Sequence, residues 1–199
     1  MTLTFWFDVH SPWCYLAASR IGGLARKHGL ELLWRPLHLP SMADAINGRR
    51  PLEANPAFVA WYKQDLEDWA ELQGLPVRYH PGYPLRNARA LRACQYAADA
   101  GKAEIFVQRV LRGYWAEQAD ISDLDVLAGW AGPCGLSGDA VKAAATNDVY
   151  KARIAANTAE AIARGVFGVP SVDTGKKLYF GNDRLGLLDE HLTRQKNLR

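Results

Sequence analysis

The chain has 199 residues, of which 49% are hydrophobic, so it is long enough to bury one substantial core or two smaller ones that share an interface. Its 24 Lys and Arg residues against 21 Asp and Glu residues give a net charge of +3 without a dense basic run, which argues against nucleic acid as the main partner and suits a small anionic ligand. Three scattered cysteines, no signal-peptide pattern and no apolar run of about 18 residues predict a soluble cytoplasmic protein with no membrane association and no disulfide framework.

The N-terminal segment predicts a β-α-β unit. Residues 3–9, LTFWFDV, are aromatic and β-branched, which is typical of a buried strand. Ser11 and Pro12 supply an N-cap and a proline at the first helical position, and apolar residues recur at helical spacing over 15–28. A glycine ends this helix. Residues 30–37, LELLWRPL, predict a second strand, and the helical crossover implies that it runs parallel to the first.

The rest of the chain changes pattern twice. Between residues 41 and 165 we expect only helices, separated by Pro and Gly; the stretch 148–164 is alanine-rich and helical by propensity. Residues 169–181, VPSVDTGKKLYFG, predict two strands joined by a turn at Thr174-Gly175. Residues 183–195 predict a final helix.

Joined across the helical insertion, these segments have the order β-α-β, then β-β-α. That order is typical of a thioredoxin-like core, in the α/β class. We therefore expect a thioredoxin-like domain built from residues 1–40 and 165–199, with an inserted helical domain at 41–164.

The stretch HSPWCYLA, residues 10–17, contains the first candidates for chemistry. Ser11 stands where a strand ends and a helix begins, where unpaired amide donors and the helix dipole favour a bound anion or thiolate. The alternative is that Ser11 is only an N-cap, worth about 1 kcal/mol. Cys14 lies one turn further on, and a single helical sulfur cannot form a redox pair. We expect Cys14, Cys94 and Cys134 to be packing residues, and no spacing suggests a metal site.

Two stretches near the C-terminus offer binding groups. Val169 precedes Pro170, which is either an ordinary proline at the start of a strand or a cis proline that turns the Val169 backbone toward Ser11. In the second case the Val169 amide and carbonyl can pair with an extended, peptide-like ligand. Asn182 and Asp183 open the last helix, either as a cap or as groups that receive a ligand ammonium.

Taken together, the stretches FDVHSPWCYLA, WRPL, NTAEAIARGVFGVPS and LYFGNDRLGLLDEHL resemble the 2-hydroxychromene-2-carboxylate isomerase family. That family is related to kappa-class glutathione transferases and DsbA-like thioredoxin-fold proteins. The resemblance covers nearly the whole chain, including LRNARALRA and YWAEQADISD in the insertion. It implies a thioredoxin fold with a helical insertion of the DsbA and kappa-transferase type, a homodimer, and glutathione as a cofactor that is not consumed.

The resemblance also implies a role for each candidate residue. Ser11, the catalytic residue, would hydrogen-bond the glutathione sulfur. Val169, before a proline that is cis in this family, would pair through its backbone with the cysteinyl part. Asn182 and Asp183 would hold the γ-glutamyl end, and Asn47 resembles an asparagine that reaches the glycyl side.

One position departs from the family pattern. In this family a lysine often stands soon after the proline of the segment that corresponds to residues 55–58. Here that segment reads NPAF, with Phe58 after Ala57 and no lysine before Lys63. Lys63, Arg49 and Arg50 are the candidates to supply the missing charge. The alternative is weaker binding of the glycyl carboxylate.

By this resemblance the protein isomerises aromatic keto acids of the 2-hydroxychromene-2-carboxylate type from aromatic hydrocarbon catabolism, with the glutathione thiolate as nucleophile. A kappa-class-like glutathione transferase or peroxidase would share the Ser11 site but consume glutathione. A thiol-disulfide oxidoreductase would act through Cys14 instead. Four tryptophans are candidates for an aromatic substrate pocket, the alternative being core packing: Trp13, Trp34, Trp61 and Trp69.

Overall fold

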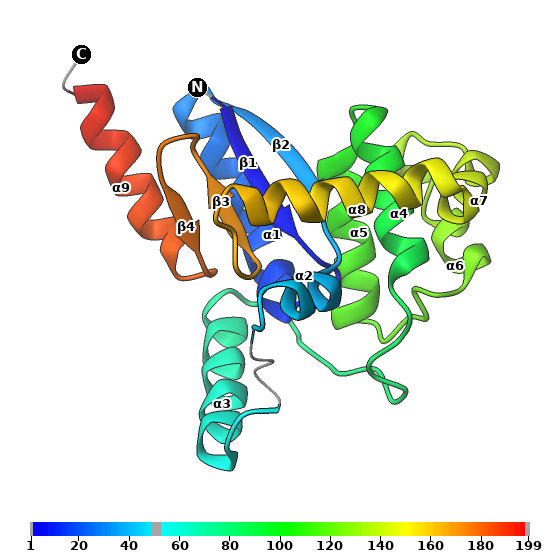
Figure 1. Ribbon diagram of the computed structural model, residues 1–199, viewed down its shortest axis with the longest axis horizontal. Coiled ribbons are helices and arrows are strands. Elements are labelled where there is room, and N and C mark those ends of the chain that lie inside the picture. The colour runs from blue at the N-terminus through cyan, green and yellow to red at the C-terminus, as the bar shows by residue number, and fades with distance from the viewer. Residues whose placement is uncertain (1, 49–52, 198–199) are drawn as a thin grey trace.

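The computed structural model describes residues 2–48 and 53–197 and shows a four-stranded sheet with helices on both faces (Figure 1). In chain order the described elements are β1 (Thr2–Phe7), α1 (Pro12–His28), β2 (Glu31–Pro36), α2 (Leu39–Ala45), α3 (Pro56–Leu72), α4 (Ala88–Asp99), α5 (Ala103–Trp115), α6 (Leu124–Gly129), the 3-10 helix η2 (Gly132–Cys134), α7 (Gly138–Thr146), α8 (Asp148–Ala163), β3 (Ser171–Asp173), β4 (Leu178–Phe180) and α9 (Arg184–Asn197). Within the described part of the chain, no helix has the length and apolar character needed to cross a membrane.

The sheet has the strand order β2-β1-β3-β4. β1 runs parallel to β2, with Phe5 opposite Trp34, as the crossover through α1 predicts. β3 is antiparallel to both β1 and β4, and the turn between β3 and β4 forms the expected hairpin. This topology confirms the predicted thioredoxin-like fold of the DsbA type.

The two faces of the sheet are covered by different helices. Side chains alternate along β1, so Phe5 and Phe7 share a face and pack edge-on against Trp34, with ring centroids 5.1 and 6.0 Å apart. α1 lies behind this face in Figure 1, and α8 crosses the opposite one in front of the strands. Asn157 of α8 donates from Nδ2 to the Pro36 carbonyl at 2.9 Å, which ties α8 to the end of β2.

Among its described residues the predicted insertion contains helices joined by loops and no strand, and it shares one core with the sheet. The buried residues of the sheet, α1, α4 and α5 form a continuous apolar cluster. α3 stands apart from the body in Figure 1. Its predicted apolar stripe is only partly covered: Leu66 is buried, whereas Phe58 near the start of the helix is exposed.

Candidate active site

Ser11 caps the N-terminus of α1, as predicted. Its backbone is extended, with φ −92° and ψ 117°, and its Oγ accepts a hydrogen bond from the Cys14 amide at 3.3 Å. The Ser11 carbonyl also accepts from Cys14 at 3.0 Å and from Tyr15 at 3.3 Å. Pro12 has no amide hydrogen, so the first-turn donor that remains is the Trp13 N–H, which lies too early in the helix for an intrahelical acceptor. This end of α1 is suited to an anion.

The loop before β3 brings Val169 to the same place. The Val169-Pro170 peptide bond is cis, as the resemblance implied, and the Ser11 hydroxyl donates to the Val169 carbonyl at 3.4 Å. Both residues are 6% exposed. The Gly181 amide donates to the Pro170 carbonyl at 2.9 Å, which attaches the start of α9 to this loop. Two hydrogen bonds therefore connect three segments that are far apart in the sequence: Ser11 to Val169, and Pro170 to Gly181.

Asn182 directly follows Gly181 in the chain and accepts hydrogen bonds from α1 and from the end of α3. It is 1% exposed, and its carbonyl accepts from Arg20 Nη2 of α1 at 2.9 Å. Its side-chain Oδ1 accepts from Gln73 Nε2, at the end of α3, at 3.2 Å. Its Nδ2 is buried and has no hydrogen-bond partner among the described residues. An unsatisfied buried donor beside a candidate ligand site indicates a group that the ligand satisfies.

Asp183 presents a carboxylate at the surface beside Asn182. The conformation depends on Gly181, which has φ 109°, and a Cβ on Gly181 would lie 2.5 Å from Asp183 Oδ1. On α3, burial raises the pKa of the Asp65 carboxyl, and the nearby charges of Asp183 and Asp68 raise it further. The residue before α9 and a residue of α3 thus bring acidic groups together here, where Arg184 Nη1 lies 3.5 Å from Asp183 Oδ2 and a ligand ammonium would add to that ion pair.

The other predicted ligand contacts lie further out. Asn47 is in the turn after α2 with φ 52°, its side chain is exposed, and within the described chain no hydrogen bond joins it to Ser11, Val169 or Asn182. Lys63 is exposed on α3. Arg49 and Arg50 lie outside the described residues.

The cysteines are placed as packing residues, as predicted. Cys14, Cys94 and Cys134 are buried free thiols. Burial raises the pKa of the Cys14 thiol far above its usual range, and the same cause raises the pKa of Cys94. A thiol that stays protonated and covered is neither a nucleophile nor a partner in exchange.

Asp8 organises the loop that carries Ser11, a role that sequence reasoning missed. This fully buried carboxylate accepts hydrogen bonds from the His10 amide at 2.9 Å, from the Leu39 amide at 2.7 Å and from Asn87 Nδ2 at 2.7 Å. The Asp8 carbonyl accepts from the Ser11 amide at 3.1 Å. Asp8 thereby ties the loop that carries Ser11 to the starts of α2 and α4. The sequence signal that could have identified this role is an acidic residue at the end of a predicted buried strand.

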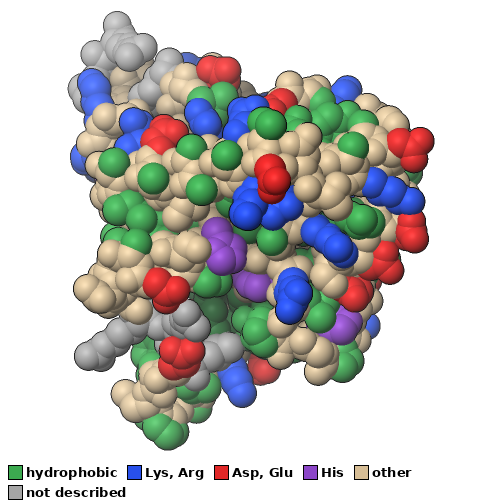
Figure 2. Space-filling model, turned by 45° about the vertical axis from the view of Figure 1, so that its right-hand side comes forward, with side chains coloured by type: hydrophobic (Ala, Val, Ile, Leu, Met, Phe, Trp, Pro, Cys, Tyr) green, Lys and Arg blue, Asp and Glu red, His purple; other side chains and the backbone are tan. Residues whose placement is uncertain are grey.

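Aromatic side chains flank the Ser11 end of α1. The Trp13 ring packs edge-on against Tyr62 of α3, with centroids 5.7 Å apart. Trp61, 54% exposed, lies beside Phe58 at 5.5 Å. Figure 2 shows a hollow between the α3 lobe, at the bottom, and the body of the molecule, with hydrophobic side chains inside it and histidine side chains at its upper edge. Trp69 lies further along α3, under the Arg20 guanidinium at 5.8 Å.

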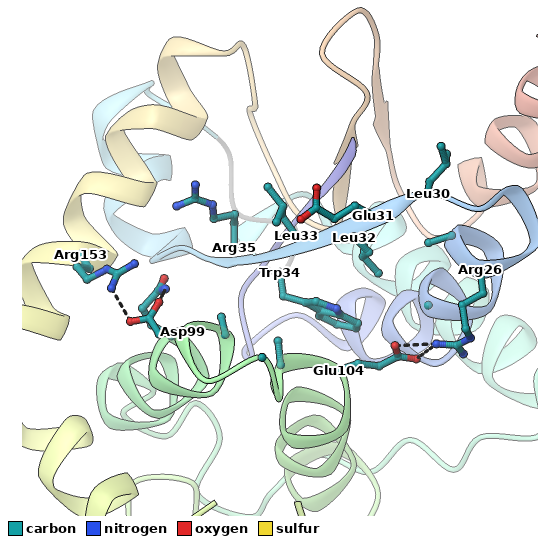
Figure 3. Close-up of a pocket in the computed structure, with 16 residues that line it drawn as sticks. Arg26, Leu30, Glu31, Leu32, Leu33, Trp34, Arg35, Asp99, Glu104 and Arg153 are labelled. Carbon is teal, nitrogen blue, oxygen red and sulfur yellow. Dashed lines mark hydrogen bonds and ion pairs between the residues drawn. The ribbon is translucent and has the colours of Figure 1, made fainter. Parts of the chain in front are cut away.

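A separate cavity of about 570 Å³ runs along β2, between α1, α4 and α5 (Figure 3). The Arg26–Glu104 ion pair, at 2.8 Å, and the Arg153–Asp99 ion pair lie at its walls. Trp34 lines this cavity, and none of the five predicted glutathione contacts does. Trp34 is therefore a core residue beside a hollow that is separate from the candidate site at Ser11.

Known proteins that resemble this chain have the same fold and match it over nearly its whole length. A family model described as a DSBA-like thioredoxin domain matches residues 2–193. A 2-hydroxychromene-2-carboxylate isomerase of Sphingobium xenophagum is 31% identical over 96% of this chain and 97% of that protein, and one of Pseudomonas putida is 30% identical over 98% and 95%. A solved structure of a 2-hydroxychromene-2-carboxylate isomerase superposes with a TM-score of 0.89 at 28% identity, covering 100% of this chain and 97% of the other.

Proposed function

This chain belongs to the DSBA-like thioredoxin family and, within it, to the 2-hydroxychromene-2-carboxylate isomerases, and from that premise we propose that it isomerises an aromatic keto acid of this type with glutathione as cofactor. The substrate would be a ring-cleavage intermediate of aromatic hydrocarbon catabolism. The observation that carries the proposal is the hydrogen bond between the Ser11 hydroxyl and the Val169 carbonyl at the N-terminus of α1, with Gly181 bonded to the adjoining Pro170.

The donors and acceptors at this site fit the three parts of glutathione. A thiolate suits the Ser11 hydroxyl and the Trp13 amide at the helix N-terminus. The buried backbone at Val169 suits the peptide portion. Asn182 Nδ2, which has no partner in the part of the chain that the structure describes, suits a ligand oxygen, and Asp183 with Asp65 suits the γ-glutamyl ammonium.

Bound glutathione would supply a thiolate that adds to the unsaturated side chain of the substrate and leaves again after rotation. The protein supplies position and electrostatics. The Ser11 hydroxyl donates to the Val169 carbonyl at 3.4 Å, which is long for an O–H···O bond, so its proton can turn to a better acceptor at little cost. A hydrogen bond from this hydroxyl to a thiolate is worth about 1.5–3 kcal/mol and lowers the pKa of the bound thiol.

We propose that the aromatic substrate lies against the rings next to Ser11. Trp13 and Tyr62 form one aromatic wall, and Phe58 and Trp61 continue it along α3. Such rings bury a large apolar area and orient a planar ligand. Phe58 and Trp61 are exposed, so they are available to a ligand that enters from solvent.

The structure disfavours the oxidoreductase alternative. That reaction requires a reactive Cys14, whose thiol is buried and has a raised pKa. A transferase would use the same Ser11 site, and it differs from an isomerase only in whether glutathione is consumed.

The proposal is tested by following the absorbance of a 2-hydroxychromene-2-carboxylate with purified protein, with and without glutathione. We expect a spectral change that requires both. S-methylglutathione, whose sulfur cannot become a thiolate, should bind but not support the reaction. A reaction that proceeds equally well without glutathione would overturn the role of the cofactor.

We also propose that the protein works in the cytoplasm as a homodimer, as the resemblance implies. The exposed apolar side chains of Phe167 and Phe180, whose ring centroids lie 4.7 Å apart, offer surface for a second copy to cover. Sedimentation equilibrium gives the mass directly, and a mass of one chain at micromolar concentration would contradict the dimer.

A further inference from the structure

We propose that His10 is a second catalytic residue, whose Nδ1 carries the proton that must move when the chromene ring of the substrate opens. This inference rests on the proposed function, because it concerns another step of the same reaction. It assigns to His10 a proton transfer that neither the glutathione thiolate nor Ser11 performs.

The chemistry of the substrate class requires that step. A 2-hydroxychromene-2-carboxylate is a cyclic hemiketal, and the double bond between its C3 and C4 atoms is not conjugated to a ketone while the ring is closed. A thiolate adds readily only to the open form, in which the C2 ketone draws electrons through that double bond. Ring opening therefore precedes the nucleophilic step, and it moves one proton from the C2 hydroxyl to the phenol oxygen.

The hydrogen bond of the His10 ring defines which nitrogen can take that proton. Nε2 lies 2.5 Å from the Leu85 carbonyl oxygen, which can only accept, so Nε2 carries the hydrogen and donates it. Rotation of the ring by half a turn would place Cε1 against this carbonyl and lose the bond, so the two orientations are not equivalent. In the neutral ring Nδ1 is then the nitrogen with a free electron pair.

Nδ1 of His10 is available to a ligand beside Ser11. It bonds to no other described residue, and the buried side-chain atoms that lack a partner belong to other residues, so solvent reaches it. Asp8 holds both residues in one turn: its Oδ1 accepts from the His10 amide at 2.9 Å, and its carbonyl accepts from the Ser11 amide at 3.1 Å. C2 of the substrate is two bonds from C4, which the thiolate attacks, so the groups that act on the two atoms must come from adjacent positions.

The groups around the His10 ring fix it and cannot replace it as a base. The ring lies beside Tyr83 and Tyr114, with centroids 6.4 and 6.1 Å away, and the Leu85 amide donates to the Tyr114 hydroxyl at 3.3 Å. Burial raises the pKa of both tyrosines, so their phenols stay protonated. Asp8 is fully buried and already accepts from three donors. Among these described groups, His10 offers the free basic electron pair.

The proposed step balances without a co-reactant. Nδ1 takes the proton of the C2 hydroxyl, whose electron pair forms the second bond of the ketone. The bond between C2 and the ring oxygen breaks, and its electron pair stays on that oxygen. The imidazolium then returns the proton to the phenolate, which leaves His10 neutral and the substrate open to thiolate addition. Nothing is oxidised or reduced.

Two substitutions separate base catalysis from positioning. In His10→Gln the amide NH2 can donate to the Leu85 carbonyl in place of Nε2, but the side chain has no basic nitrogen. In His10→Phe the ring remains and both nitrogens are lost. His191→Phe is the matched control, since this half-buried histidine of α9 also engages one ring nitrogen, with the Tyr179 hydroxyl at 2.8 Å.

The readout is the turnover number with saturating glutathione on two substrates, followed by absorbance. One is a 2-hydroxychromene-2-carboxylate, and the other is cis-2-methoxybenzylidenepyruvate, an open-chain analogue whose methylated oxygen cannot close the ring. From the usual contribution of general acid–base catalysis, we expect both His10 variants to lose about 100-fold or more on the chromene. On the open ether they should match the wild type. Glutathione affinity, measured by calorimetry, should stay unchanged, and His191→Phe should match the wild type on both substrates.

The other outcomes are decisive as well. An unchanged rate of His10→Gln on the chromene overturns the inference, because the contact with Leu85 would then be all that matters. An equal loss on both substrates shows that His10 only supports the site, and overturns it too. So does a wild type that isomerises the chromene but not the open ether, since the thiolate would then not act on the open chain. A wild-type reaction that does not require glutathione overturns the proposed function itself, whereas dependence on glutathione with any of the first three results overturns the role of His10 alone.

Discussion

Replacing Ser11 with alanine removes the hydroxyl that we place against the glutathione sulfur. Loss of one hydrogen bond to a thiolate, worth about 1.5–3 kcal/mol, raises the pKa of the bound thiol by about 1–2 units. The direction follows because the lost donor stabilised only the charged form. At a pH well below that pKa the isomerisation rate should fall about 10- to 100-fold, and it should recover as the pH rises and thiolate forms unaided.

The same substitution also removes an N-cap, so stability has to be separated from chemistry. Ser11 Oγ accepts from the Cys14 amide at 3.3 Å, and losing this cap costs about 1 kcal/mol of folding free energy. Its bond to Val169, at 3.4 Å, is long and adds little. Ser11→Gly is the matched control, because glycine is tolerated at an N-cap at a cost of a few tenths of a kcal/mol.

The assay is the ultraviolet thiolate absorbance of bound glutathione as a function of pH, alongside the pH–rate profile and the melting temperature. We expect both variants to share the raised thiol pKa, with Ser11→Gly closer to the wild type in stability. If the thiol pKa stays at the wild-type value in both variants, Ser11 is only a helix cap and the reasoning is refuted.

Three further substitutions test the surrounding residues. Cys14→Ser should leave the turnover number within about 2-fold of wild type while costing about 1–3 kcal/mol of stability, since it buries a more polar group; an inactive but folded variant would restore the redox alternative. Asp183→Ala should weaken glutathione binding by about 1–3 kcal/mol in calorimetry through loss of a charge-assisted contact, and unchanged affinity would contradict its role as a ligand contact. Asp8→Asn should lower the free energy of unfolding by about 2–4 kcal/mol and raise the KM for glutathione, because an amide cannot accept all the bonds that the buried carboxylate accepts; an unchanged denaturation midpoint would show that Asp8 does not hold the loop.

Local signals in the sequence predicted much of the fold. The buried strand at the N-terminus, the Ser11 cap with Pro12 after it, and the turn near Gly175 each depend on neighbours in sequence, and the structure contains all three. Boundaries shifted slightly: β3 begins at Ser171 instead of Val169, because Val169 belongs to the loop with the cis peptide bond.

Features that depend on distant segments were not predictable in the same way. The Gln73–Asn182 pair joins residues 109 positions apart, and Asp8 meets Asn87 across 79 positions. No local pattern specifies such contacts. The tryptophans show the same limit: Trp34 and Trp61 were both candidates for the substrate pocket, yet the first is buried against Phe5 and the second is exposed on α3.

The central claim is that glutathione acts here as a nucleophilic cofactor, and its amount after many turnovers tests this most directly. We would incubate the protein with excess 2-hydroxychromene-2-carboxylate and limiting glutathione, then quantify free thiol, glutathione disulfide and glutathione conjugates by mass spectrometry. The account predicts many product molecules formed per glutathione, with the free thiol fully recovered. Stoichiometric conversion of glutathione into a conjugate or into disulfide would contradict it.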